Sequence, residues 1–130
     1  MKPKTIASSI APWLTVRSSF KAIDFYKNAF NAEEVYRLEM GGEDLVVRLS
    51  IGDSEFWVSN GSSENKKAES LGGGTVRLIL TVPDPDALFA QALKAGATQI
   101  FAVGEDHGWR LGRLVDPFGL NWEIGRPLTV

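Results

Sequence analysis

The residues with the clearest potential for chemistry are one glutamate, one histidine and three arginines. Glu123 follows the segment Asp116-Pro117-Phe118-Gly119, whose proline and glycine favour a tight turn between two strands. A carboxylate on the strand after such a turn can hold a metal ion, act as a base or pair with a cation. His107, the only histidine, can change its charge near neutral pH. Glu123 and His107 are therefore the candidate catalytic residues, with an ion-pair partner and a loop residue as the structural alternatives.

Composition argues against several classes of function. The 130-residue chain has a formal net charge of −2, so no basic excess points to a nucleic-acid partner. It contains no cysteine, which rules out a thiolate nucleophile and a disulfide framework. No apolar run approaches the ~20 residues of a membrane span, and no signal core follows the N-terminus. We expect a cytoplasmic protein with neither a nucleic-acid nor a membrane partner.

The elements that must position these residues follow the same order in both halves of the chain. Hydrophobic periodicity, caps and turn residues predict a strand, a helix and three further strands in each half. In the first half these are residues 6–16, 20–30, 33–40, 45–51 and 55–59. In the second half they are residues 75–82, a helix from 83–86 to 94, residues 98–103, and the two strands of the hairpin around Asp116.

An internal duplication explains this order. Leu14-Thr15-Val16 matches Leu80-Thr81-Val82 at a separation of 66 positions, whereas Arg48-Leu49 matches Arg113-Leu114 at 65. Trp57 matches Trp122, also at 65. We therefore expect one domain over residues 1–130, in which repeat 1 spans about 6–59, a linker 60–74 and repeat 2 about 75–126. One unit is too small to bury both its helix and its sheet, so the two should pack together.

This tandem β-α-β-β-β pattern resembles the vicinal oxygen chelate superfamily, which includes glyoxalase I, bleomycin-resistance proteins and extradiol dioxygenases. The Phe25-Tyr26 pair on the first helix and the Asp-Pro-x-Gly hairpin carry the resemblance, which is greatest to the bacterial glyoxalase-like branch. It implies an α+β fold in which tandem modules form a curved mixed sheet around a cavity, with the helices outside. It also implies a homodimer that binds a small molecule.

The resemblance also assigns four metal-ligand positions, usually His, Glu, His and Glu. Mapped through the internal alignment, these positions hold Ala11, Val58, Arg77 and Glu123. Only the glutamate is a metal ligand by type, and an arginine adds a positive charge that opposes a cation. We therefore expect no metal and no other cofactor. In place of the metal, Arg77 and Glu123 should form an ion pair, and breaking a buried pair costs about 3–5 kcal/mol.

Strand alternation predicts what lines the cavity. Leu45, Val47 and Leu49 form one apolar face, which leaves Arg48, and its repeat mate Arg113, on the other. The expected ligand-binding residues are Trp13, Arg48, Phe56, Arg77, Trp109, Arg113 and Glu123. Three arginines among aromatic side chains suit a small, anionic, aromatic molecule. The alternatives are strand charges at a solvated edge for the arginines, and core or dimer-interface roles for the tryptophans.

Three functions compete. The first is a binding protein with a degenerate metal site, as the bleomycin-resistance resemblance implies. The second is an enzyme of the same superfamily, either a metal-dependent lyase, isomerase or dioxygenase, or a metal-free enzyme that uses Glu123 or His107 as a base. The third is a subunit whose cavity has filled, which would leave a structural role.

Overall fold

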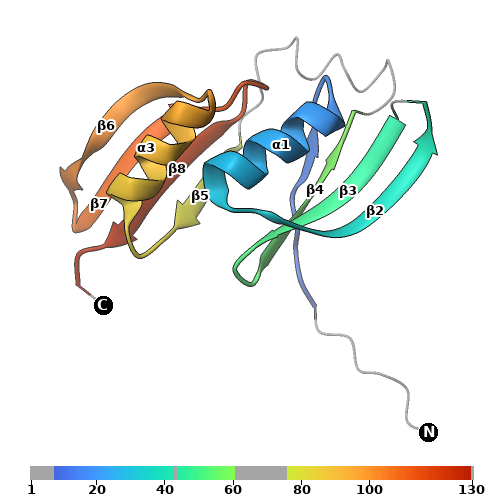
Figure 1. The fold of residues 1–130 in the computed structure, drawn as a ribbon. Coiled ribbons are helices and arrows are strands. Elements are labelled where there is room, and N and C mark those ends of the chain that lie inside the picture. Colours follow the sequence, from blue (N-terminus) through green and yellow to red (C-terminus); the bar gives the residue numbers. More distant parts are fainter. Residues whose placement is uncertain (1–7, 43, 61–75, 130) are drawn as a thin grey trace, which may run out of the picture.

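The structure is a computed structural model that describes residues 8–42, 44–60 and 76–129 (Figure 1). All but the first residue of the expected linker, 60–74, lies outside these residues. The first half contains β1 (Trp13–Thr15), α1 (Ser19–Phe30), β2 (Glu33–Gly41), β3 (Asp44–Ile51) and β4 (Ser54–Ser59). The second half contains β5 (Arg77–Thr81), α3 (Pro85–Ala95), β6 (Thr98–Asp106), β7 (Trp109–Val115) and β8 (Asn121–Pro127). The two halves thus share one order of elements.

The strands form two separate four-stranded mixed sheets. Sheet A has the order β1-β4-β3-β2 and sheet B the order β5-β8-β7-β6. The first strand of each half pairs in parallel with the last, and the other neighbours are antiparallel. The expected α+β class is confirmed, but within the described residues the two sheets do not close around a cavity.

β1 is much shorter than the expected strand over residues 6–16. It is an edge strand and contains only Trp13, Leu14 and Thr15. Pro12 has no N–H to donate, but its carbonyl oxygen accepts a hydrogen bond of 2.8 Å from the Trp57 N–H. An edge position is the place where a sheet tolerates proline.

Both helices begin and end where the sequence places their caps. The Ser18 side chain accepts a hydrogen bond from the Lys21 N–H, and Asn31 ends α1 in the left-handed conformation. At α3, the Asp84 side chain accepts from the Ala87 N–H, and Gly96 ends the helix at a φ of 125°. These side chains satisfy backbone groups that a helix end leaves without partners, so the boundaries are set locally.

One hydrophobic core joins the two halves. α1 packs against α3, and both helices lie on the same side of the sheets (Figure 1). Aromatic rings from both halves meet beneath α1, and the Trp122 ring on β8 lies 4.6 Å from that of Phe30 and 5.7 Å from that of Tyr26. The second half thereby buries side chains against the helix of the first half. Neither half therefore has a complete core of its own.

The second repeat contains one inserted residue that the sequence alignment of the two repeats did not include. Across the β3–β4 turn Ser50 pairs with Glu55, whereas across the β7–β8 turn Val115 pairs with Asn121, so the second turn is one residue longer. The structural mate of Glu123 is therefore Trp57, and that of Trp122 is Phe56. The alignment of Trp57 with Trp122 was wrong, because one added turn residue reverses the face of every side chain that follows.

Candidate functional site

Each sheet has one face covered by a helix and an opposite face, here called the open face. In sheet A, Leu45, Val47 and Leu49 are buried beneath α1, so Arg48 between them points to the open face. In sheet B, the fully buried Leu114 likewise sets Arg113 on the open face. The expectation that the two arginines share the side away from the helices is met.

The open face of sheet A is aromatic. Trp13 and Trp57 stack with ring centroids 5.6 Å apart, and the Tyr36 ring meets Trp57 edge-on at 5.8 Å. The Trp13 Nε1–H donates a hydrogen bond of 2.9 Å to Ser59 Oγ, which fixes its ring. The Arg48 guanidinium lies over Trp57 at 5.2 Å, within the range of a cation–π contact. Trp13 remains 54% exposed, so this face presents a flat aromatic surface to solvent.

The open face of sheet B carries more charge. Arg77 Nε lies 3.6 Å from Glu123 Oε1, which bears out the expected ion pair. The two residues are diagonal neighbours, since Arg77 pairs with Asn121 and Glu123 pairs with Ile79. Arg113 lies opposite Glu123 on the next strand, and its guanidinium covers the Phe101 ring at 5.4 Å.

The ion pair is more exposed than the sequence suggests. The Arg77 side chain keeps 45% of its surface accessible, although that of Glu123 keeps only 15%. Solvent screens such a pair, so its net contribution is about 1 kcal/mol rather than the 3–5 kcal/mol expected of a buried pair. β5 is an edge strand, which leaves one side of Arg77 open to water.

Two of the expected positions lie on the wrong side of sheet A. Phe56 and Val58 are buried on the helix-facing side, where the Phe56 ring contacts Tyr26 edge-on at 5.4 Å. They therefore do not share a face with Arg48, and the extra residue of the β7–β8 turn is the reason. The side chain that takes this place on the open face is Trp57.

His107 and Trp109 lie at the far end of sheet B. His107 is in the β6–β7 turn with a φ of 51°, and its side chain is 90% exposed. Its Nδ1 lies 2.8 Å from Asp106 Oδ1. Trp109 is the first residue of β7 and pairs with Asp106 and Pro127. A base role for His107 has no support in the positions of these side chains.

The sequence analysis missed four residues of the open faces. Tyr36 and Phe101 were overlooked because they lie on the edge strands β2 and β6, outside the aligned motifs. Glu55, which lies 3.5 Å from Arg48 Nε, adds a second carboxylate to the set. Trp57 was assigned to the helix side through its match with Trp122. Antiparallel pairing of Trp57 with Arg48 was the available signal, because cross-strand partners share a face.

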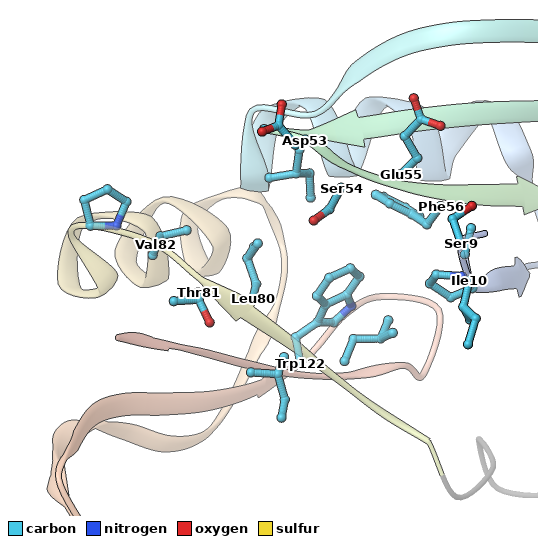
Figure 2. Close-up of a pocket in the computed structure, with 17 residues that line it drawn as sticks. Ser9, Ile10, Asp53, Ser54, Glu55, Phe56, Leu80, Thr81, Val82 and Trp122 are labelled. Carbon is cyan, nitrogen blue, oxygen red and sulfur yellow. The ribbon is translucent and has the colours of Figure 1, made fainter. Parts of the chain in front are cut away.

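A cleft of about 780 Å³ lies where the edges of the two sheets approach each other. Residues 9–12 and the β3–β4 turn line one side, and residues 78–83 line the other. Figure 2 shows Trp122 reaching into this cleft from sheet B. Of the expected ligand-binding residues only Phe56 lines it, and Glu55 and Ile79 connect it to the two open faces.

The residues present do not fit the metal that the resemblance implies. When the two repeats are aligned by their strand pairing, the four metal-ligand positions hold Ala11, Trp57, Arg77 and Glu123. The one carboxylate among them is paired with the arginine. Nowhere in the described part of the chain do three His, Cys, Asp or Glu side chains gather as a metal site. A divalent ion needs at least three protein or water ligands of suitable type, and these side chains offer one.

A family model describing the Glyoxalase/Bleomycin resistance protein/Dioxygenase superfamily matches residues 6–124. The chain belongs to this superfamily. An uncharacterized protein of Mycobacterium bovis is 36% identical over 132 residues, a match that covers 95% of this chain and 86% of that protein. The superfamily assignment agrees with the fold and with the resemblance found in the sequence.

Solved structures with this fold include two proteins with informative names. TioX from Micromonospora sp. superposes with a TM-score of 0.73 at 21% identity and covers 95% of this chain and 98% of its own. The fosfomycin resistance protein FosX from Listeria monocytogenes gives 0.71 at 19% identity, with 96% and 97% covered. At these identities the likeness shows the superfamily fold alone. Among the described helices, none is long and apolar enough to cross a membrane.

Proposed function

We propose that this protein is a metal-free small-molecule-binding member of the superfamily and takes an anionic, aromatic ligand on its open faces. The observation that carries the proposal is the set of side chains at the four equivalent positions. An alanine, a tryptophan and an ion-paired arginine and glutamate replace a ligand set for a metal. Around them lie exposed aromatic rings and two further arginines, which suit an aromatic anion better than a cation.

A second copy of the chain completes the site in this proposal. Large apolar side chains stay exposed on both open faces, among them Trp13, Leu38, Ile79 and Phe101. Several large exposed apolar side chains on one face favour an interface in a protein that folds in water. A homodimer covers these faces and turns an open surface into an enclosed one, where a small ligand loses contact with water.

Metal content tests the first half of the proposal. Elemental analysis of protein purified without a metal-affinity tag should give far less than one divalent ion per chain. A thermal-shift titration with Zn²⁺, Mn²⁺ and Ni²⁺ should leave the melting temperature unchanged. One metal per chain together with a stabilising shift would refute the metal-free assignment and favour a metal-dependent enzyme.

Tryptophan fluorescence tests the second half. In a screen of aromatic carboxylates, a ligand on the open face of sheet A should quench the emission of Trp13 and Trp57. Trp57→Phe should weaken binding about threefold, because the smaller ring keeps part of a stacking contact that contributes about 1–1.5 kcal/mol in full. Trp109→Phe, at the far end of sheet B, is the matched control and should bind normally. If no compound shifts the melting temperature of the native protein, the binding function itself fails.

A further inference from the structure

Arg113 is a charged residue at the centre of the open face of sheet B. Its Nε is buried and has no hydrogen-bond partner. Among the residues that the structure describes, Arg113 forms no ion pair. Burying an N–H group of a guanidinium without an acceptor costs free energy, so its environment calls for an acceptor from outside the chain.

The nearest carboxylate does not fill this role. Glu123 is the cross-strand partner of Arg113, but its carboxylate is within ion-pair distance of Arg77. Arg77, Arg113 and Glu123 together carry one net positive charge on the open face of sheet B. The Phe101 ring packs beneath the guanidinium and holds it in place.

The equivalent arginine in repeat one indicates which kind of acceptor Arg113 lacks. Arg48 is the equivalent of Arg113, also stacks on aromatic rings, and likewise has a buried Nε without a hydrogen-bond partner. Unlike Arg113, it forms an ion pair, because a carboxylate oxygen of Glu55 lies 3.5 Å from its Nε. Glu55 pairs with Ser50 as Asn121 pairs with Val115, so Asn121 is its equivalent in sheet B. Repeat two therefore keeps the arginine and has a neutral amide where repeat one has the carboxylate.

We propose that Arg113 binds the carboxylate of an aromatic monocarboxylate, which occupies the place that Glu55 takes in repeat one. This assignment rests on the proposed function and names the anion site within it. A guanidinium presents two parallel N–H groups, which match a planar carboxylate. The single positive charge left on this face matches one negative charge. Phe101 and Ile79, both more than half exposed, provide apolar contact for the ring.

The test compares 2-naphthoate with its neutral analogue 2-naphthamide by isothermal titration calorimetry. The native protein should bind the anion at least about tenfold more tightly, as one charge-assisted hydrogen-bonded pair contributes. Arg113→Gln should abolish this preference. Arg110→Gln, on the same strand but hydrogen-bonded to both carboxylate oxygens of Asp86, is the matched control and should retain it.

A second variant does not depend on removing the arginine. Asn121→Glu restores in sheet B the carboxylate of repeat one, and it should lower the affinity for naphthoate about tenfold without changing that for naphthamide. Circular dichroism checks that each variant is folded.

Equal affinity of the native protein for the two probes, binding of neither, or an undiminished preference in Arg113→Gln, would overturn the assignment of Arg113. The proposed binding function would survive these results if the wider ligand screen still yields a binder. The proposed binding function is refuted only if no compound in that screen binds.

Discussion

At the scale of single residues, Asp116 connects the two halves of the molecule. Its carboxylate is 4% exposed and accepts hydrogen bonds from the Tyr26 hydroxyl at 2.6 Å and the Trp122 Nε1–H at 2.9 Å. It also accepts from the backbone N–H groups of Phe118 and Leu120. Burial raises the pKa of the Asp116 carboxyl, and the donated hydrogen bonds offset part of that rise. Burial also raises the pKa of Tyr26 well above 10.0, and the charge of Asp116 adds to this effect.

Replacing Asp116 by Asn should destabilise the protein by about 1–3 kcal/mol at pH 7. The amide has one acceptor oxygen, so it cannot accept both from Tyr26 and Trp122 and from the two backbone N–H groups. The stability advantage of the native protein over the variant should grow as the pH falls through the pKa of folded Asp116 towards the usual value of 3.8. The folded state binds the proton more tightly than the unfolded state, so lowering the pH favours folding through this group. Urea denaturation at several pH values measures both effects.

Asp86→Asn provides a control of opposite sign. The hydrogen bonds from Arg110 hold the pKa of the Asp86 carboxyl below 3.8, so any stability that this group contributes is lost as the pH falls. An advantage of native protein over Asp116→Asn that stays constant, or that shrinks at acid pH, would contradict the assigned direction.

At the scale of elements, the β7–β8 turn has the largest consequences. The Asp116 backbone N–H and carbonyl bond to Leu120 and Gly119, and the turn closes with Gly119 at a φ of 88°. This conformation strains any residue with a Cβ atom. The turn residues were predicted from the sequence by their types. The length of the β7–β8 turn relative to the β3–β4 turn was not predicted. Because the β7–β8 turn is one residue longer, Glu123 and Trp57 occupy equivalent places in the two sheets.

Gly119→Ala should lower the free energy of unfolding by about 1 kcal/mol. No atom lies within 4 Å of the position that the new Cβ would take, so the cost comes from the backbone conformation alone. Gly104→Ala is the matched control, since its surroundings are equally open and its φ is not positive. The same loss of stability in both variants, measured by urea denaturation, would show that the turn conformation is not the cause.

At the scale of the whole molecule, the arrangement of the sheets leaves apolar surface uncovered. The helices cover one side of the sheets (Figure 1). The rings of Phe30 on α1 and Trp122 on β8 join the two halves. The other side presents the aromatic open face of sheet A and the charged open face of sheet B. One chain therefore builds a complete core, and under the proposed function it supplies only part of an enclosed site.

We expect analytical ultracentrifugation to give twice the chain mass of 14.2 kDa. Ile79→Glu places a charge on the 59%-exposed apolar residue at the edge of sheet B and should weaken the dimer by tenfold or more, about 1.4 kcal/mol. Ala90→Glu adds the same side chain to the exposed side of α3 and should leave the dimer intact. A native protein that sediments as a monomer at all concentrations would refute the proposed covering of the open faces.

The sequence by itself determined the order of elements, the helix caps and the face of Arg48 and Arg113. These features depend on residues within a few positions of one another, where capping, turn geometry and strand alternation act. The tertiary structure decided the contact between Tyr26 and Asp116, the exposure of Arg77 and the replacement of Val58 by Trp57 on the open face. Such features depend on how distant strands align, and one additional turn residue changes that alignment with almost no local signature. The separation of the sheets is also tertiary, because it reflects how the helices of both modules share one core.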